Sequence, residues 1–86
     1  MHERTMRPVI SLRLKEWERR MNAKDLATDS ARAERIGVSR TTVSRVQQGP
    51  SEPGGIRPGE NFIAGVLYAF PDLRFEDVFE IEQVSA

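Results

Sequence analysis

The side chains best placed to do chemistry in this chain lie between residues 40 and 48, in the run RTTVSRVQQ. At about 100° per residue, a helix here points Val43 and Val46 to one side. The opposite side is polar, cationic and free of carboxylates. It is formed by Thr41, Ser44, Arg45 and Gln48, with Arg40 on its flank. Hydroxyl, amide and guanidinium groups can bond phosphates and base edges, so the stripe suits recognition of a nucleic acid.

The sequence contains no comparable set of catalytic residues. The only histidine is His2, there is no cysteine, and no Ser/His/Asp set or metal-ligand spacing occurs. The loop at residues 49–59, with its four glycines and three prolines, has no lysine in P-loop register and no strand before it. We therefore predict a protein that is not an enzyme and that needs no cofactor or metal.

A preceding helix and a tight turn must position the polar stripe. Ala33 and Ile36 are three residues apart and share one helix face. Gly37 can end that helix in the left-handed conformation. Ser39 can then cap the next helix with its hydroxyl group. Residues 33–49 are therefore expected to form a helix, a turn and a second helix.

This run, AERIGVSRTTVSRVQQG, resembles the helix-turn-helix of the Cro/C1-type (XRE) family of phage and bacterial DNA-binding regulators. The resemblance rests on Ala33, on Gly37 and on branched apolar residues at positions 36, 38, 43 and 46. It implies an all-α, compact five-helix, lambda-repressor-like domain. It also implies that the following residues contact DNA: Ser39, Arg40, Thr41, Thr42, Ser44, Arg45, Gln48 and Arg57.

The resemblance covers about residues 10–80 and sets the expected boundaries. Residues 1–9 are predicted to be a flexible arm, 10–80 the DNA-binding domain, and 81–86 a C-terminal tail and candidate dimer contact. Helices are expected at 10–21, 40–48, 60–70 and 72–79. The second helix either runs unbroken over 24–36, which we favour, or breaks near 28–30 and is capped again by Asp29 or Ser30. The alternating segment 79–84 is either a strand or helix extension that forms a dimer, or a frayed tail.

Four single residues carry further expectations. Trp17 lies at helical spacing between Leu14 and Met21, which predicts a core position. Gly65 is expected to allow close approach of a neighbouring element. Gln47 points inward, where many members of the family have a glutamate paired with an arginine of the first helix. The resemblance thus implies a neutral hydrogen bond between Gln47 and Arg13.

Charge is divided between the two halves of the chain, although the net charge is zero. Residues 1–48 hold eleven Lys/Arg against six Asp/Glu, a net charge of +5. Residues 49–86 hold two against seven, a net charge of −5. The basic half contains the helix-turn-helix, so it can meet phosphates while the acidic half faces away.

These features predict a sequence-specific transcriptional regulator, a phage- or prophage-type repressor that binds double-stranded DNA as a homodimer. No apolar run is long enough to span a membrane, and residues 1–11 are too polar for a signal peptide. A cytoplasmic protein, associated with the nucleoid through DNA, is expected. Two alternatives stay open: the antitoxin of a toxin–antitoxin pair, which would also bind a toxin, and a protein-interaction module built on the same scaffold.

Overall fold

The computed structural model describes residues 5–85, and it has strands at both ends of the chain. β1 (Met6–Leu12) and β2 (Phe79–Ser85) pair as an antiparallel two-stranded ribbon. Between them the described chain forms five helices: α1 (Leu14–Ala23), α2 (Asp29–Ile36), α3 (Arg40–Gln48), α4 (Glu60–Ala69) and α5 (Phe75–Val78). The prediction of an all-α domain is therefore wrong, because residues 6–12 and 79–85 pair as strands. Residues 1–4 of the predicted arm and residue 86 of the predicted tail lie outside the described residues.

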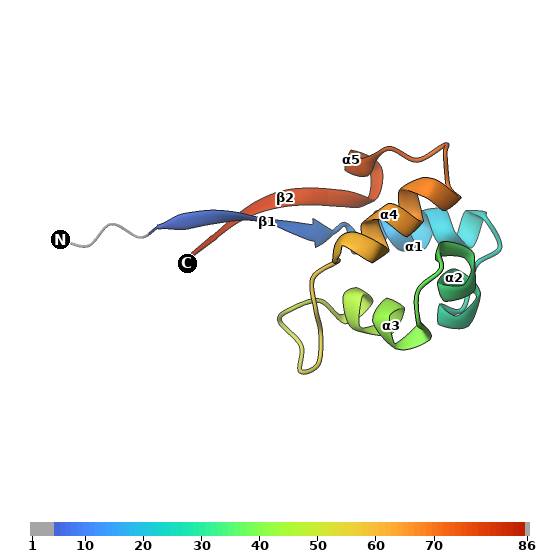
Figure 1. The fold of residues 1–86 in the computed structure, drawn as a ribbon, viewed down its shortest axis with the longest axis horizontal. Helices are drawn as coiled ribbons and strands as arrows, with labels where there is room; N and C mark the ends of the chain where they lie inside the picture. The colour runs from blue at the N-terminus through green and yellow to red at the C-terminus, as the bar shows by residue number, and fades with distance from the viewer. Residues whose placement is uncertain (1–4, 86) are drawn as a thin grey trace.

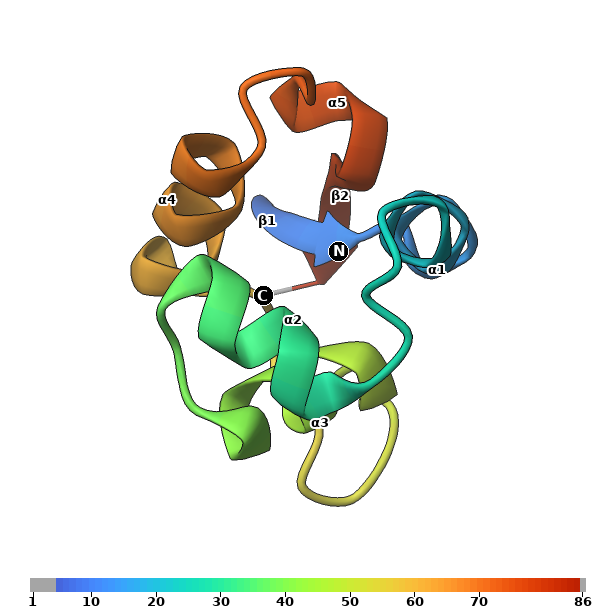
Figure 2. The ribbon, with the colours of Figure 1, turned by 90° about the vertical axis from the view of Figure 1, so that its right-hand side faces the viewer.

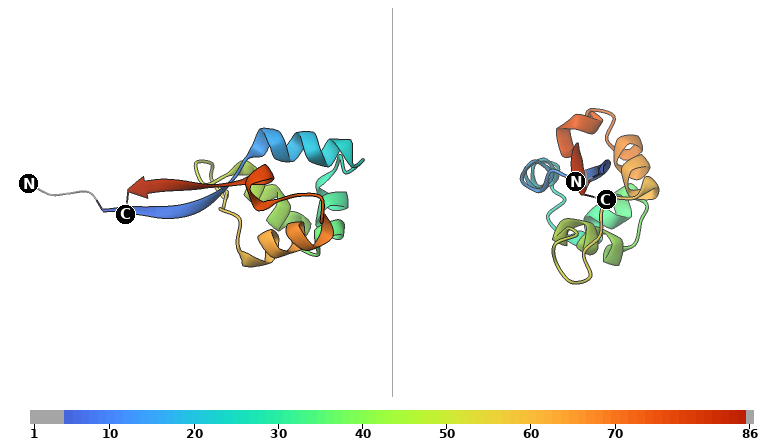
Figure 3. Two further views of the ribbon diagram at one scale, coloured as in Figure 1. Left: turned by 90° about the horizontal axis from the view of Figure 1, so that it is seen from above. Right: turned by 90° about the vertical axis from the view of Figure 1, so that its left-hand side faces the viewer.

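The ribbon projects from the helical body, so the molecule is elongated (Figures 1 and 3). Its principal extents are 52, 27 and 21 Å. Viewed along the ribbon, the helices are arranged around its inner end (Figure 2). Only that inner end enters the core, where Phe79 is 1% exposed. Within residues 5–85, no helix is long and apolar enough to cross a membrane.

An aromatic cluster from three elements forms the centre of the core. The ring centroids of Trp17 in α1 and Phe62 in α4 are 5.4 Å apart, and Phe62 meets Phe79 of β2 edge-on at 6.2 Å. All three side chains are almost completely buried, as are Met21 and Val66. The prediction that Trp17 belongs to the core is confirmed. Burial of this apolar area is the main stabilising term that holds the helices in place.

The first helix starts later than the sequence predicted. Ile10 shares its spacing with Leu14 and Trp17, which led us to expect a helix over 10–21, but Ile10 lies in β1 opposite Ile81. The chain becomes helical only at Leu14, after the amide of Arg13 has bonded the carbonyl of Val78 at 2.8 Å. Backbone pairing with β2 therefore overrides the helical periodicity of these three positions.

The second helix is short, so the favoured prediction of an unbroken helix over 24–36 is wrong. After α1 the chain turns through Asp25, whose φ is 61°, and the amide of Leu26 bonds the carbonyl of Met21 at 2.9 Å. α2 begins after Thr28, whose hydroxyl oxygen accepts a hydrogen bond from the amide of Ala31 at 3.1 Å. The alternative is right that a new helix begins near residues 28–30, but residues 24–28 are not helical and the cap is Thr28 instead of Asp29 or Ser30.

The fourth and fifth helices also differ in detail from the prediction. α4 ends at Ala69, and α5 is a single turn that starts at Phe75 instead of residue 72. The carboxylate of Asp77 accepts a hydrogen bond from the amide of Arg74 at 2.8 Å and so caps α5. Gly65 does lie at a close approach: a Cβ atom there would be 2.2 Å from the carbonyl oxygen of Ile36 in α2. That prediction is confirmed.

Candidate nucleic-acid interface

The turn between α2 and α3 has the geometry that its residues favour. Gly37 is left-handed, with a φ of 77°, and its amide bonds the carbonyl of Ala33 at 2.9 Å. The hydroxyl of Ser39 accepts from the amide of Thr42 at 3.0 Å and so caps α3. Val43 and Val46 are buried on the inner side of α3. These contacts fix which side of α3 faces outward.

The outward side of α3 forms the floor of an open groove of about 680 Å³, which we call the recognition groove. One wall is the start of α2, and the other is the tip of the loop between α3 and α4. Its lining residues are Thr28, Asp29, Ser30, Arg40, Thr41, Ser44, Arg45, Gln48, Pro53 and Gly54. Five of the eight residues predicted to contact DNA therefore lie together in one groove.

The other three predicted residues lie outside the recognition groove. Ser39 and Thr42 are at the start of α3, where their side-chain oxygens are 2.9 Å apart. Both line a second hollow of about 550 Å³ beside the first turn of α4, and Arg57 lines it as well. Arg57 is turned toward the root of the ribbon, where its Nη1 bonds the hydroxyl of Ser11 at 2.6 Å and lies 3.7 Å from the carboxylate of Glu82.

Gln47 connects α3 to both helices that precede it. Its Oε1 accepts hydrogen bonds from Trp17 Nε1 at 2.9 Å and from Arg32 Nη1 at 2.8 Å. Its Nε2 donates to the carboxylate of Asp29 at 2.8 Å. An amide can make all three bonds because it both donates and accepts, whereas a glutamate at this position would face Asp29 with a second negative charge. The orientation of α3 is therefore supported by one amide group that bonds three side chains of α1 and α2.

Arg32 completes this network, and the sequence analysis missed it. The residue is only 2% exposed. Its Nε donates to the carbonyl of Leu26 at 2.7 Å, and its two terminal nitrogens meet the two carboxylate oxygens of Glu18, each at 2.9 Å. The helical periodicity could have indicated that Arg32 is buried, because Arg32 shares the inward side of α2 with Ala33 and Ile36. A bidentate arginine thus joins α1, α2 and α3.

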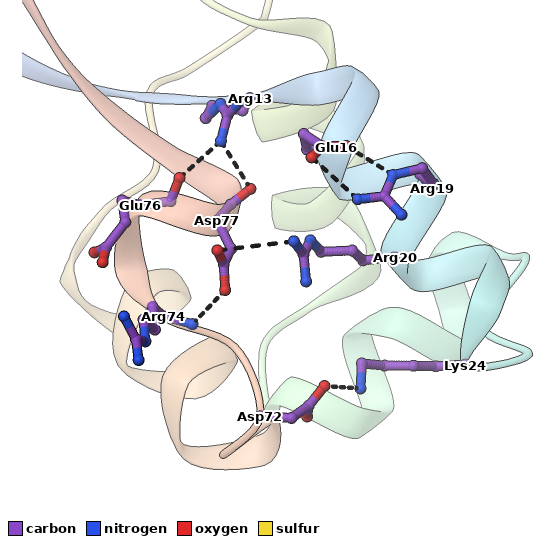
Figure 4. Close-up of polar contacts among 9 residues, drawn as sticks. All are labelled: Arg13, Glu16, Arg19, Arg20, Lys24, Asp72, Arg74, Glu76 and Asp77. Carbon is purple, nitrogen blue, oxygen red and sulfur yellow. Dashed lines mark hydrogen bonds and ion pairs between the residues drawn. The ribbon is translucent and has the colours of Figure 1, made fainter.

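The predicted bond between Gln47 and Arg13 is absent, because Arg13 bonds the other end of the domain. Its Nη1 donates to the carbonyl oxygens of Glu76 at 2.8 Å and Asp77 at 3.3 Å (Figure 4). The arginine that bonds Gln47 is Arg32 of α2, whereas the resemblance implied an arginine of the first helix.

Two cations at the end of α1 and just after it meet the acidic C-terminal part of the chain (Figure 4). Arg20 lies 3.7 Å from Asp77, and Lys24 donates to Asp72 at 2.7 Å. The hydrogen bond from Lys24 lowers the pKa of the Asp72 carboxyl. By contrast, within residues 5–85 neither Arg40 nor Arg45 forms an ion pair. Both arginines of the recognition groove therefore keep a positive charge that no described carboxylate neutralises.

The glycine-rich loop is folded back onto the end of α3. The amide of Ile56 bonds the carbonyl of Arg45 at 3.0 Å. Gly55 packs so closely on the backbone of Gly49 that a Cβ atom at position 55 would overlap the carbonyl oxygen of Gly49. This packing places Pro53 and Gly54 beside α3 as a wall of the recognition groove.

Comparisons of the chain with protein-family models, with curated proteins and with solved structures find no match. The interface is therefore described from the residues of this chain alone. Among residues 5–85, no group of three His, Cys, Asp or Glu side chains is placed to hold a metal ion.

Replacing Arg57 by glutamine is expected to loosen the loop without unfolding the domain. The substitution removes the ion pair with Glu82 and weakens the bond to Ser11, which together anchor the loop at the ribbon. Hydrogen exchange at the amide of Ile56 should become faster, because local opening then costs less free energy. Glu52→Gln is the matched control in the same exposed loop and should leave that exchange rate unchanged. Equal rates in wild type and Arg57→Gln would contradict the anchoring role.

Proposed function

We propose that this chain is a sequence-specific DNA-binding transcriptional regulator, and that it acts as a repressor of the phage or prophage type by occupying a promoter. The observation that carries the proposal is the recognition groove. Five polar side chains of one helix, two of them arginines outside any described ion pair, point into it from a rigidly held backbone. Among the residues that line it, Asp29 is the only carboxylate.

In the proposed complex α3 lies in the major groove of DNA. An α-helix with side chains is about 10–12 Å across, which fits a major groove about 12 Å wide. Arg45 can form a bidentate contact with guanine, and Gln48 can do so with adenine. Arg40, at the first turn of α3, can reach a phosphate, and the hydroxyls of Thr41 and Ser44 can bond either phosphates or bases.

The two walls of the recognition groove would then meet the DNA backbone on either side of α3. At one wall, Thr28 and Ser30 offer hydroxyl groups close to the first turn of α2, where backbone amides favour anions. At the other wall, Gly54 lets the loop backbone approach closely without a side chain. Asp29 is held by Gln47, so its carboxylate is directed at the protein's own amide group.

The proposal includes a homodimer that binds two half-sites. One α3 covers only a few base pairs, which is too short a sequence to specify one promoter. Helix-turn-helix proteins commonly solve this with two copies on half-sites one helical turn of DNA apart. A symmetric pair of half-sites in the bound sequences would therefore report both the specificity of α3 and the presence of the dimer.

Selection of bound fragments from random duplex DNA, followed by titration at two salt concentrations, tests the proposed function. Arg45→Ala is expected to weaken binding to the selected site by about 1–3 kcal/mol and to relax the base preference at one position. Wild-type affinity should fall steeply as salt rises, because contacts with phosphates release counterions. The matched control is Arg35→Ala, since Arg35 lies on the exposed side of α2 away from the recognition groove and stacks over Phe70.

Two outcomes would overturn the proposed function. The first is that no duplex is enriched and that binding stays absent at low salt. The second is that Arg35→Ala and Arg45→Ala weaken binding equally, because the recognition groove would then have no special part in it. Enrichment of a site whose recognition depends on Arg45 and not on Arg35 supports the proposal.

A further inference from the structure

The two faces of the ribbon differ in charge. Because side chains alternate along paired strands, the register sorts the ribbon residues into two sets. One face, here called the uncharged face, holds Met6, Pro8, Ile10, Leu12, Phe79, Ile81, Gln83 and Ser85. The other, here called the charged face, holds Arg7, Val9, Ser11, Glu80, Glu82 and Val84. Every charged side chain of the two strands therefore lies on one face.

The uncharged face runs outward from the core into solvent. At its inner end Phe79 is buried and Leu12 is half-buried against the core. Farther out, Ile10 is half-buried, whereas Ile81 is 58% and Met6 50% exposed. These two are among the five exposed large apolar residues of the described chain. A two-stranded ribbon is only marginally stable in water on its own, so apolar side chains on its outer part favour a covering partner.

The edges of the ribbon are poorly suited to pairing with a second copy. The amide of Arg13 bonds the carbonyl of Val78, so every second residue of β1 from Arg13 backwards bonds β2 through its backbone. Pro8 belongs to the other set, whose backbone groups point to the free edge of β1. Pro8 has no N–H to offer there. Pairing through the free edge of β2 would bring Glu80 and Glu82 of two copies onto one face, where like charges repel.

The uncharged face has no such conflict, because it can lie against itself without opposing any charges. We propose that this face packs against the same face of a second copy around a two-fold axis. Ile10 and Ile81 of one copy then meet those of the other, while Glu82 on the charged face keeps its ion pair with Arg57. The inference rests on the proposed function, because the interface would form the dimer that binds two half-sites of DNA.

Sedimentation of the full chain over a range of concentrations, without DNA, tests this interface. Wild type is expected to be a dimer, and Ile81→Gln should raise its dissociation constant at least about tenfold, or about 1.4 kcal/mol. The matched control is Glu80→Gln, which places the same side chain at the neighbouring position on the charged face and should leave the dimer intact. Circular dichroism and thermal unfolding would verify that both variants keep the fold. A wild type that stays monomeric, or equal effects of the two variants, would overturn the inference.

Cross-linking distinguishes this face from the edges. The chain has no cysteine, so one introduced residue gives an unambiguous site. Ile81→Cys should be joined to a second copy by a short bismaleimide, whereas Glu80→Cys should not. Equal cross-linking of both would contradict face-to-face packing. A dimer that binds no DNA would overturn the proposed DNA binding and leave the interface standing. A monomer that binds the selected DNA would overturn the interface, and with it the homodimer, but would leave the proposed DNA binding standing.

Discussion

Replacing Arg32 by methionine is expected to destabilise the domain by about 2–3 kcal/mol. Removing one partner of a buried ion pair typically costs about 3–5 kcal/mol. The expected cost is lower here because the Glu18 side chain is 42% exposed and can regain water. The carbonyl of Leu26 would lose the N–H donor that lies 2.7 Å away. The side-chain oxygen of Gln47 would keep the hydrogen bond from Trp17 but lose the one from Arg32. Urea unfolding followed by circular dichroism measures the loss.

The matched control for Arg32→Met is Arg35→Met. Arg35 is on the same helix but exposed, and its described contact is with the ring of Phe70, 5.5 Å from the guanidinium carbon. Its replacement should cost less than about 1 kcal/mol, as for other exposed cation–π pairs. Equal losses for the two variants would show that the buried network does not hold the helices together. Arg32→Met should also weaken DNA binding, because Gln47 and hence α3 lose a support.

Gly65→Val is expected to cost about 3 kcal/mol, the upper end of the usual cost of overpacking. A Cβ atom at position 65 would lie 2.2 Å from the carbonyl oxygen of Ile36, so α2 and α4 would have to separate. Because the obstacle is backbone, a change of side-chain rotamer cannot relieve it. In a domain of this size each kcal/mol lowers the melting temperature by about 4–8 °C, so calorimetry would detect the change.

Ala64→Val provides the comparison for Gly65→Val. Ala64 is exposed and precedes Gly65 on α4, so valine there costs only helix propensity, about 0.5 kcal/mol. A melting temperature for Gly65→Val close to that of Ala64→Val would contradict the close packing of α2 against α4. The expected difference also bears on function, because displacement of α2 would move one wall of the recognition groove.

Local sequence signals predicted the helix-turn-helix well. Gly37 and Ser39 act through bonds within three or four residues of themselves, and Val43 and Val46 mark the buried side of α3 directly. The ends of the chain were predicted poorly, because β1 and β2 are defined by pairing across almost the whole sequence. Ile10 happens to share the helical spacing of Trp17, and only the partner strand decides against a helix there.

The internal network shows a second limit of prediction from sequence. The inward direction of Gln47 followed from periodicity, but its partner did not, since Arg13 and Arg32 are equally basic in the sequence. Only the break after α1 brings Arg32 against Glu18 and Leu26. Arg57 is a similar case. The resemblance implied a contact between Arg57 and DNA, whereas its side chain bonds Ser11 and pairs with Glu82, which are distant in sequence.

The most direct measurement is a nuclear magnetic resonance titration of the isotope-labelled chain with the duplex selected from random DNA. The largest shift changes are expected at the amides of α3, at Ser30 and at Gly54, which together outline the recognition groove. The amides of α5 should change little, because α5 packs against α1, away from the groove (Figure 2). Changes centred on α5 or on the exposed Tyr68, with none at α3, would contradict DNA recognition by this groove.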